Sequence, residues 1–186
     1  MPGVLFRVVG RIGFAALLLG LVSACAGPQS ASGPAATAPA PDRAAGAAAR
    51  IEVADKPLQC VPYARALSGI EIRGDAWTWW RSAEGQFRRD RSPAPGAVLV
   101  LSRSDQIRLG HLAVVTEVIG PREILVDHAN WLNRGNIHRM TPVRDVSAAN
   151  DWSAVRVWYT PGRQLGVRVY PAEGFIHPEG AQAALQ

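Results

Sequence analysis

The sequence predicts an α+β domain in which two early helices precede a series of antiparallel strands. Helix-like stretches with start and stop residues lie between residues 58 and 85, and β-branched runs follow between residues 97 and 159. A turn at Gly120-Pro121 joins two of these runs into a hairpin. With 186 residues, 48% of them hydrophobic, the chain can form one ordinary domain with extensions.

Residues 1–24 predict a signal peptide. Arg7 and Arg11 precede an apolar run over residues 12–24, which suits a signal sequence but is short for a membrane span of about 20 residues. The run ends in "VSAC", which resembles the lipobox of bacterial lipoproteins. This resemblance implies that Cys25 carries a lipid and becomes the first mature residue. A plain secretory signal cleaved near the same place is the alternative.

Residues 25–50 consist mostly of Ala, Pro, Gly and Ser. Such a segment buries too little apolar surface to offset its ordering entropy, which predicts a disordered tether. We expect the domain to occupy residues 51–172 and a C-terminal tail to occupy residues 173–186.

The first predicted helix follows Cys60 in "VPYARALSG", with Pro62 at the first helical position and Gly69 at the stop. The second lies in "GDAWTWWRSAEG", with Asp75 as its cap. Trp77 and Trp80 are three residues apart and should share the core face, which leaves Trp79 exposed.

The strands follow in order. Residues 97–102 predict a buried strand, residues 111–131 the hairpin, and residues 153–161 a further strand, with one more expected over residues 165–171. His138 and His177 fall in loop-like stretches, where we expect exposed side chains, and Asp90 lies in a polar loop and needs no role.

The charged residues disfavour nucleic-acid binding. The formal net charge is +5, from 20 Lys and Arg against 15 Asp and Glu, but these residues are scattered and form no basic run. A charge of this sign also suits an acidic polymer or an anionic surface.

The hairpin brings polar side chains together. Because side chains alternate along a strand, His128 and Asn130 share one face while Asp127 points to the other. Pairing around the turn places His111 opposite about residue 129, beside His128 and Asn130.

Cys60 has several possible roles. If Cys25 is lipidated, Cys60 has no disulfide partner in the chain. A buried inert thiol, a zinc ligand and a nucleophile remain open, although no short C-x-x-C or H-x-x-x-H spacing favours zinc. A position at a helix start beside an imidazole would favour the reactive thiolate. We therefore expect no metal and no cofactor.

Five segments, in order, resemble the CHAP domain, the cysteine, histidine-dependent amidohydrolase/peptidase of bacterial cell-wall enzymes. They are "LQCVPYARALSG", "GDAWTWW", "PAPGAVLVL", "GHLAVVTEV" and "ILVDHANW", between Leu58 and Tyr159. The resemblance implies a papain-like α+β fold, with the cysteine on an early helix packed on an antiparallel sheet. It also implies an amide hydrolase acting on peptidoglycan, with Cys60 as nucleophile and His111 as general base.

The chain departs from the family pattern at one position. The family usually has Glu-x-Asn-Trp where this chain has His128-Ala129-Asn130-Trp131, and NlpC-type cell-wall peptidases resemble it with Cys-His-His. The resemblance implies that His128 or Asn130 orients His111. A neutral imidazole stabilises an imidazolium less than a carboxylate does. Gln59 is a candidate donor for the oxyanion.

The predicted function is therefore a lipid-anchored peptidoglycan amidase or endopeptidase of the bacterial cell envelope. Ala26 after Cys25, where an Asp is absent, resembles enteric lipoproteins of the outer membrane. The alternatives are a CHAP-like module that binds peptidoglycan or protein without cutting it, and an amidase acting on a small amide. The sequence leaves the cleaved bond and the oligomeric state open.

Overall fold

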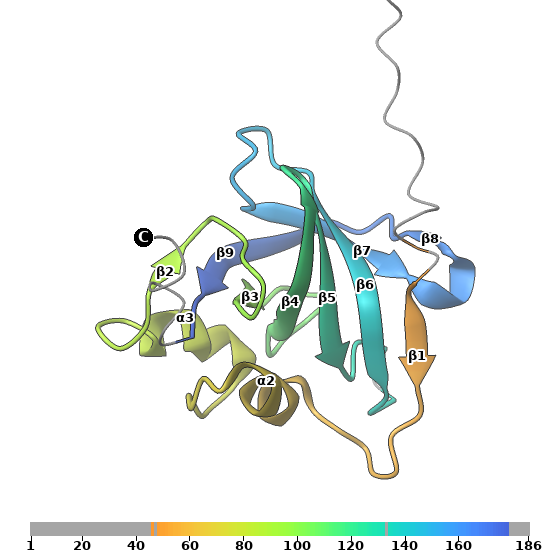
Figure 1. Ribbon diagram of the computed structural model, residues 1–186, viewed down its shortest axis with the longest axis horizontal. Helices are drawn as coiled ribbons and strands as arrows, with labels where there is room; N and C mark the ends of the chain where they lie inside the picture. Colours follow the sequence, from red (N-terminus) through yellow and green to blue (C-terminus); the bar gives the residue numbers. More distant parts are fainter. Residues whose placement is uncertain (1–45, 47, 133, 179–186) are drawn as a thin grey trace, which may run out of the picture. The chain divides into compact units, whose positions relative to one another are not determined.

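Short helices cover one outer face of a closed antiparallel sheet (Figure 1). The computed structural model describes residues 46, 48–132 and 134–178. The predicted signal peptide, Cys25, most of the predicted tether and residues 179–186 lie outside the described residues. No helix in the described ranges is long and apolar enough to cross a membrane.

The first predicted helix is confirmed as α2 (Cys60–Ser68), which ends at Gly69 in the left-handed conformation with a φ of 74°. The helix starts at Cys60, so Pro62 occupies its third position and not its first. Proline is tolerated there because the first backbone N–H groups of a helix have no intrahelical acceptor.

The second predicted helix is broken into the 3₁₀ turn η1 (Ala76–Thr78) and the short helix α3 (Trp79–Ser82). The expected orientation of the tryptophans was wrong: Trp79 is fully buried, whereas Trp77 keeps 41% of its surface exposed. A 3₁₀ turn has about three residues per turn, so it shifts the helical phase on which the expectation depended.

Within the described residues, nine strands form the sheet, and six of them close into a ring. The order β6-β5-β4-β3-β9-β7 returns to β6 through a β6–β7 pairing, and every pairing is antiparallel. The core is therefore sheet-rich and barrel-like, with few helices in the part that the structure describes. The predicted α+β class is confirmed in this form. The strands are β1 (Arg50–Glu52), β2 (Arg89–Asp90), β3 (Val98–Leu101), β4 (His111–Gly120), β5 (Glu123–Ala129), β6 (Ile137–Asp145), β7 (Ala154–Tyr159), β8 (Gln164–Leu165) and β9 (Tyr170–Ile176), with the 3₁₀ turn η2 (Thr160–Gly162) between β7 and β8.

The last strand corrects the predicted domain boundary. β9 crosses the expected boundary at residue 172 and pairs with β3, so residues 173–176 belong to the core and not to a tail. Pro171 and Gly174 hide this strand in the sequence, because both residues usually interrupt strands. Here the pairing of β9 with β3 shifts between Gly174 and Ala172, which accommodates the irregularity as a bulge.

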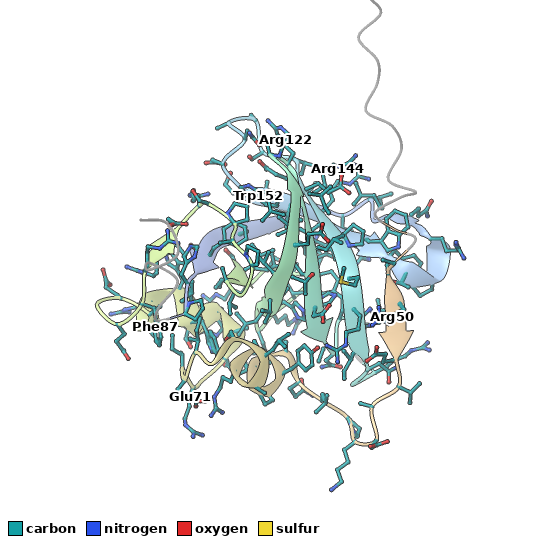
Figure 2. The ribbon with its side chains drawn as sticks, in the orientation of Figure 1. Arg50, Glu71, Phe87, Arg122, Arg144 and Trp152 are labelled. Carbon is teal, nitrogen blue, oxygen red and sulfur yellow. The ribbon has the colours of Figure 1, made fainter. Side chains whose placement is uncertain are left out.

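The closed sheet separates two apolar clusters. One fills the interior and includes Leu99, Val126 and Phe175, and the other lies between the outer face and the helices. Figure 2 shows Trp152 near the end of the sheet away from α2, where its ring packs edge-on against Phe175 with centroids 5.5 Å apart. The opposite end of the interior carries histidines in place of apolar residues.

Candidate active site

Cys60 is the first residue of α2, which packs against β4 and β5 (Figure 1). It is a free thiol and forms no disulfide with any residue that the structure describes. The backbone N–H groups of Cys60 and Val61 make no backbone hydrogen bond within the described ranges, and Pro62 has none to donate. The helix therefore directs the N–H groups of Cys60 and Val61 at the thiol sulfur, which accepts hydrogen bonds from both.

His111 begins β4, directly after a glycine that the packing requires. Gly110 has a φ of +69°, and a Cβ atom there would lie 2.8 Å from the Leu101 carbonyl oxygen and 2.8 Å from the Trp77 nitrogen. Only glycine adopts this positive φ without strain and has no Cβ atom that would collide with these two neighbours. This close approach fixes where the chain enters β4 and therefore where the His111 ring lies.

The hairpin brings His111 and His128 into direct contact. Nε2 of His111 lies 2.9 Å from Nδ1 of His128, and both rings are buried. The β4–β5 pairing joins Val114 to Asp127, which is within one residue of the expected register. Nε2 of His111 is occupied by this bond, so Nδ1 is the nitrogen available to another group.

A third buried imidazole lies beside this pair. His138 in β6 is the direct pairing partner of His128, and their ring centroids are 5.3 Å apart at an angle of 72°. The expectation that His138 is exposed was wrong, because only 2% of its surface is accessible. The sequence carries little signal for this strand, because residues 137–145 show no regular apolar alternation and include Pro142.

Asn130 and Asp127 do not contact His111. Nδ2 of Asn130 donates to Oε1 of Gln59 at 2.8 Å, and its Oδ1 accepts from the Gly135 N–H at 2.9 Å. Asn130 thus ties the end of β5 to the residue before Cys60. Asp127 lies on the outer face, as expected from the alternation, where its carboxylate accepts from Arg139 at 2.8 Å.

Aromatic rings cover the histidine pair. The Trp131 ring lies 4.8 Å from the His111 ring and 5.4 Å from the His128 ring, centroid to centroid. The Tyr170 ring packs edge-on against Trp131 at 5.0 Å. These ring contacts contribute to the burial of both imidazoles.

Cys60 and His111 line one cavity of about 970 Å³. Its walls include apolar groups such as Leu109 and Val167, whose side chains are 61% and 81% exposed. Arg108 and Arg168 also line it, and neither makes an ion pair or hydrogen bond with any residue in the described ranges. The cavity therefore combines a thiol and an imidazole with apolar surface and unpaired positive charge.

Burial controls protonation in this site. It raises the pKa of the Cys60 thiol, and backbone hydrogen bonds from Leu112, Val61 and Cys60 itself oppose this to a smaller extent. Burial lowers the pKa of His111 to about 3, with a further contribution from His138. The pKa values of His128 and His138 are also lowered, mainly by burial. The resting site therefore holds a neutral thiol and neutral imidazoles, not the thiolate expected from the helix start.

No carboxylate forms a hydrogen bond or ion pair with His111, His128 or His138 within the residues that the structure describes. There, no three His, Cys, Asp or Glu side chains are grouped so that they could hold a metal ion. His177, which was expected to be exposed, is buried and forms a separate cluster with Asp90 and Arg88. Arg88 donates to Nδ1 of His177, while Nε2 of His177 donates to Asp90 at 2.9 Å. This cluster joins β2 to the end of β9 and lies apart from the cavity.

Comparisons with known proteins found one matching family model and a similar solved structure. Residues 52–130 match the family model of the CHAP domain, and the expected CHAP domain is confirmed over that range. The fold is also similar to a crystal structure of N-acetylmuramoyl-L-alanine amidase from Staphylococcus aureus, with 22% sequence identity and a TM-score of 0.41. That similarity covers 62% of this chain and 30% of the amidase chain, so this chain spans less than a third of its length. No curated protein matches the chain.

Proposed function

We propose that this protein is a peptidoglycan hydrolase that cleaves an amide bond with Cys60 as nucleophile. One observation carries the proposal: a helix-borne thiol and His111 line the same cavity, and His128 binds the far nitrogen of His111. A nucleophile, a base and a group that orients the base define this kind of catalysis on many folds. A cysteine on an early helix beside a histidine on a sheet is also the arrangement expected for a papain-like enzyme.

The residues suggest the following steps. Nδ1 of His111 takes the thiol proton while Sγ of Cys60 attacks the amide carbonyl carbon, and the carbonyl oxygen becomes an oxyanion. The intermediate collapses with cleavage of the C–N bond, and His111 returns the proton to the leaving amine. Water then attacks the thioester with His111 as base, which releases the carboxylic acid and restores the thiol.

The oxyanion needs donors that are already in place. The N–H groups of Cys60 and Val61, which have no backbone acceptor among the described residues, face the nucleophile and fit this role. The Gln59 side chain is held by Asn130 through its oxygen, which leaves its own amide group as a further donor. Asn130 thus supports the helix start, and His128 is the group that orients His111.

The lowered pKa of His111 fits a base that works as a neutral imidazole. Because the pKa of Cys60 is raised, we propose that proton transfer accompanies the attack and that no stable ion pair forms beforehand. His128 supplies no negative charge to stabilise the imidazolium, in contrast to the glutamate usual in the family. This difference is the main support for the second candidate function, a CHAP-like module that binds without cutting.

The cavity favours a substrate with carboxylates. Arg108 and Arg168 are exposed and unpaired with any described residue, and guanidinium groups bind carboxylates in two-pronged geometry. The stem peptides of a bacterial cell wall carry such groups. We propose that the acidic part of the peptide lies along these arginines and that apolar parts contact Leu109 and Val167.

We also propose that the protein acts in the bacterial cell envelope, anchored by a lipid on Cys25. The support is the sequence alone, namely the signal-like segment and its lipobox resemblance. The expectation of the outer membrane rests on Ala26 in the same way.

Digestion of purified peptidoglycan tests the proposal. Wild-type protein and Cys60→Ala are incubated with it, and mass spectrometry identifies the released fragments and the bond cut. Products from wild type that are missing with Cys60→Ala support the hydrolase. If no product depends on Cys60 and both proteins co-sediment equally with peptidoglycan, the hydrolase is refuted and the binding module takes its place.

A further inference from the structure

Two of the three buried histidines each have a ring nitrogen without a hydrogen-bond partner among the described residues. Nε2 of His128 and Nδ1 of His138 are buried and have no hydrogen-bond partner in the part of the chain that the structure describes. His138 is the residue directly opposite His128 in the β5–β6 pairing. Buried polar atoms are nearly always bonded, so two such atoms on paired residues require an explanation.

The hydrogen bond between His111 and His128 allows two tautomeric arrangements, which differ in whether His111 can accept the Cys60 proton. A single proton is shared between Nε2 of His111 and Nδ1 of His128, which are 2.9 Å apart. If His128 holds that proton, the one proton of neutral His111 must lie on Nδ1. Nδ1 then has no lone pair to accept the Cys60 proton. If His111 holds it, Nδ1 of His111 is free, and neutral His128 must then carry its proton on Nε2.

The productive state therefore requires a buried N–H on Nε2 of His128. Left unpaired, this group would disfavour the productive tautomer, since a buried donor without an acceptor is costly. The neighbouring Trp131 ring offers only its π face at 5.4 Å. His138 offers a lone pair, provided that its proton is on Nε2.

We propose that His138 is a positioning residue, whose Nδ1 receives the Nε2–H of His128 and so holds Nδ1 of His111 ready for the Cys60 proton. The inference rests on the proposed cysteine mechanism. The rings lie 5.3 Å apart at 72°, so ring rotation or one bridging water completes the contact. His138 does not line the cavity, and in this proposal it acts on the tautomer of His111 through His128.

Amide substitutions give a matched test. Asn places an oxygen where the imidazole has Nδ1, whereas Gln places its amide farther out, near Nε2; Phe keeps a ring but has no acceptor. We expect His138→Phe and His138→Gln to lower kcat about three- to tenfold with KM unchanged, which corresponds to one hydrogen bond. His138→Asn should restore most of the wild-type kcat.

A spectroscopic measurement tests the tautomers without substrate. Ring ¹⁵N chemical shifts of the full-length protein should show the proton on Nε2 of His111 and Nε2 of His128 in wild type and His138→Asn. In His138→Phe and His138→Gln, His111 should shift toward the Nδ1–H form. Equal kcat losses in the Asn and Gln variants, or an unchanged tautomer in both Phe and Gln variants, would overturn the inference.

The two proposals fail differently. If wild-type protein releases no fragment from peptidoglycan, the hydrolase is refuted, and the ring shifts still decide whether His138 sets the tautomer. If wild type is active but carries its His111 proton on Nδ1, the role of His138 is refuted and the hydrolase stands. Should Phe at position 138 prevent folding, the Asn and Gln pair is sufficient.

Discussion

Acidification from pH 7.5 to pH 5 should destabilise the folded protein through His111, and His111→Gln should remove that part of the loss. His111 is buried, and its pKa falls from 6.5 to about 3 on folding. A group with a lowered folded pKa binds more protons in the unfolded chain, so the free energy of unfolding decreases as the pH falls below 6.5. The free energy of unfolding stops decreasing through His111 once the pH falls to about 3, the pKa of His111 in the folded protein.

The magnitude follows from these two pKa values. At pH 5 the unfolded histidine is almost fully protonated while the folded one is neutral, which costs about 2 kcal/mol relative to pH 7.5. Gln retains an amide that can hydrogen-bond to Nδ1 of His128 but does not titrate. The wild type should therefore lose about 2 kcal/mol more than the variant between the two pH values.

Urea unfolding followed by tryptophan fluorescence measures this difference, because Trp131 lies 4.8 Å from the His111 ring. Each protein is unfolded at pH 7.5 and pH 5, and only the change with pH is compared. This cancels any loss of stability that the substitution causes at both pH values. If wild type and His111→Gln lose the same free energy, His111 is not a buried neutral base and the pKa reasoning is wrong.

Two further predictions concern the entry to the site and its charge. Gly110→Ala should lower the free energy of unfolding by about 1–3 kcal/mol and also reduce kcat, because its Cβ would collide with the Leu101 carbonyl oxygen. Urea unfolding measures the first effect, and the rate of product release from peptidoglycan measures the second. A substitution that leaves both unchanged would show that this close approach does not place His111. Arg108→Ala and Arg168→Ala should each raise KM for a carboxylate-bearing stem peptide about two- to fivefold at low salt, with kcat unchanged. Arg81→Ala, which removes an exposed arginine outside the cavity, is the matched control, and an equal rise in KM there would refute a specific role.

The local parts of the site could be predicted from the sequence. The stop at Gly69 and the periodicity after Cys60 predict the helix, and the Gly120-Pro121 turn predicts the hairpin. Side-chain alternation then places His128 beside His111 and Asp127 on the other face. These are short-range relations, in which the spacing along one or two neighbouring elements determines the geometry.

Only the tertiary structure decided the remaining features, because they depend on pairing between distant segments. Closure of the sheet requires β9 to pair with both β3 and β7, and its proline and glycine conceal it as a strand. His138 reaches the site through the β5–β6 register, and Asn130 contacts Gln59 across 71 residues of chain. Burial follows from that closure, and it raises the pKa of the Cys60 thiol and lowers the pKa of His111, which favours the neutral form of each. The sequence by itself determined which residues are candidates for the proposed chemistry, and the closed sheet decided their burial and their hydrogen-bond partners.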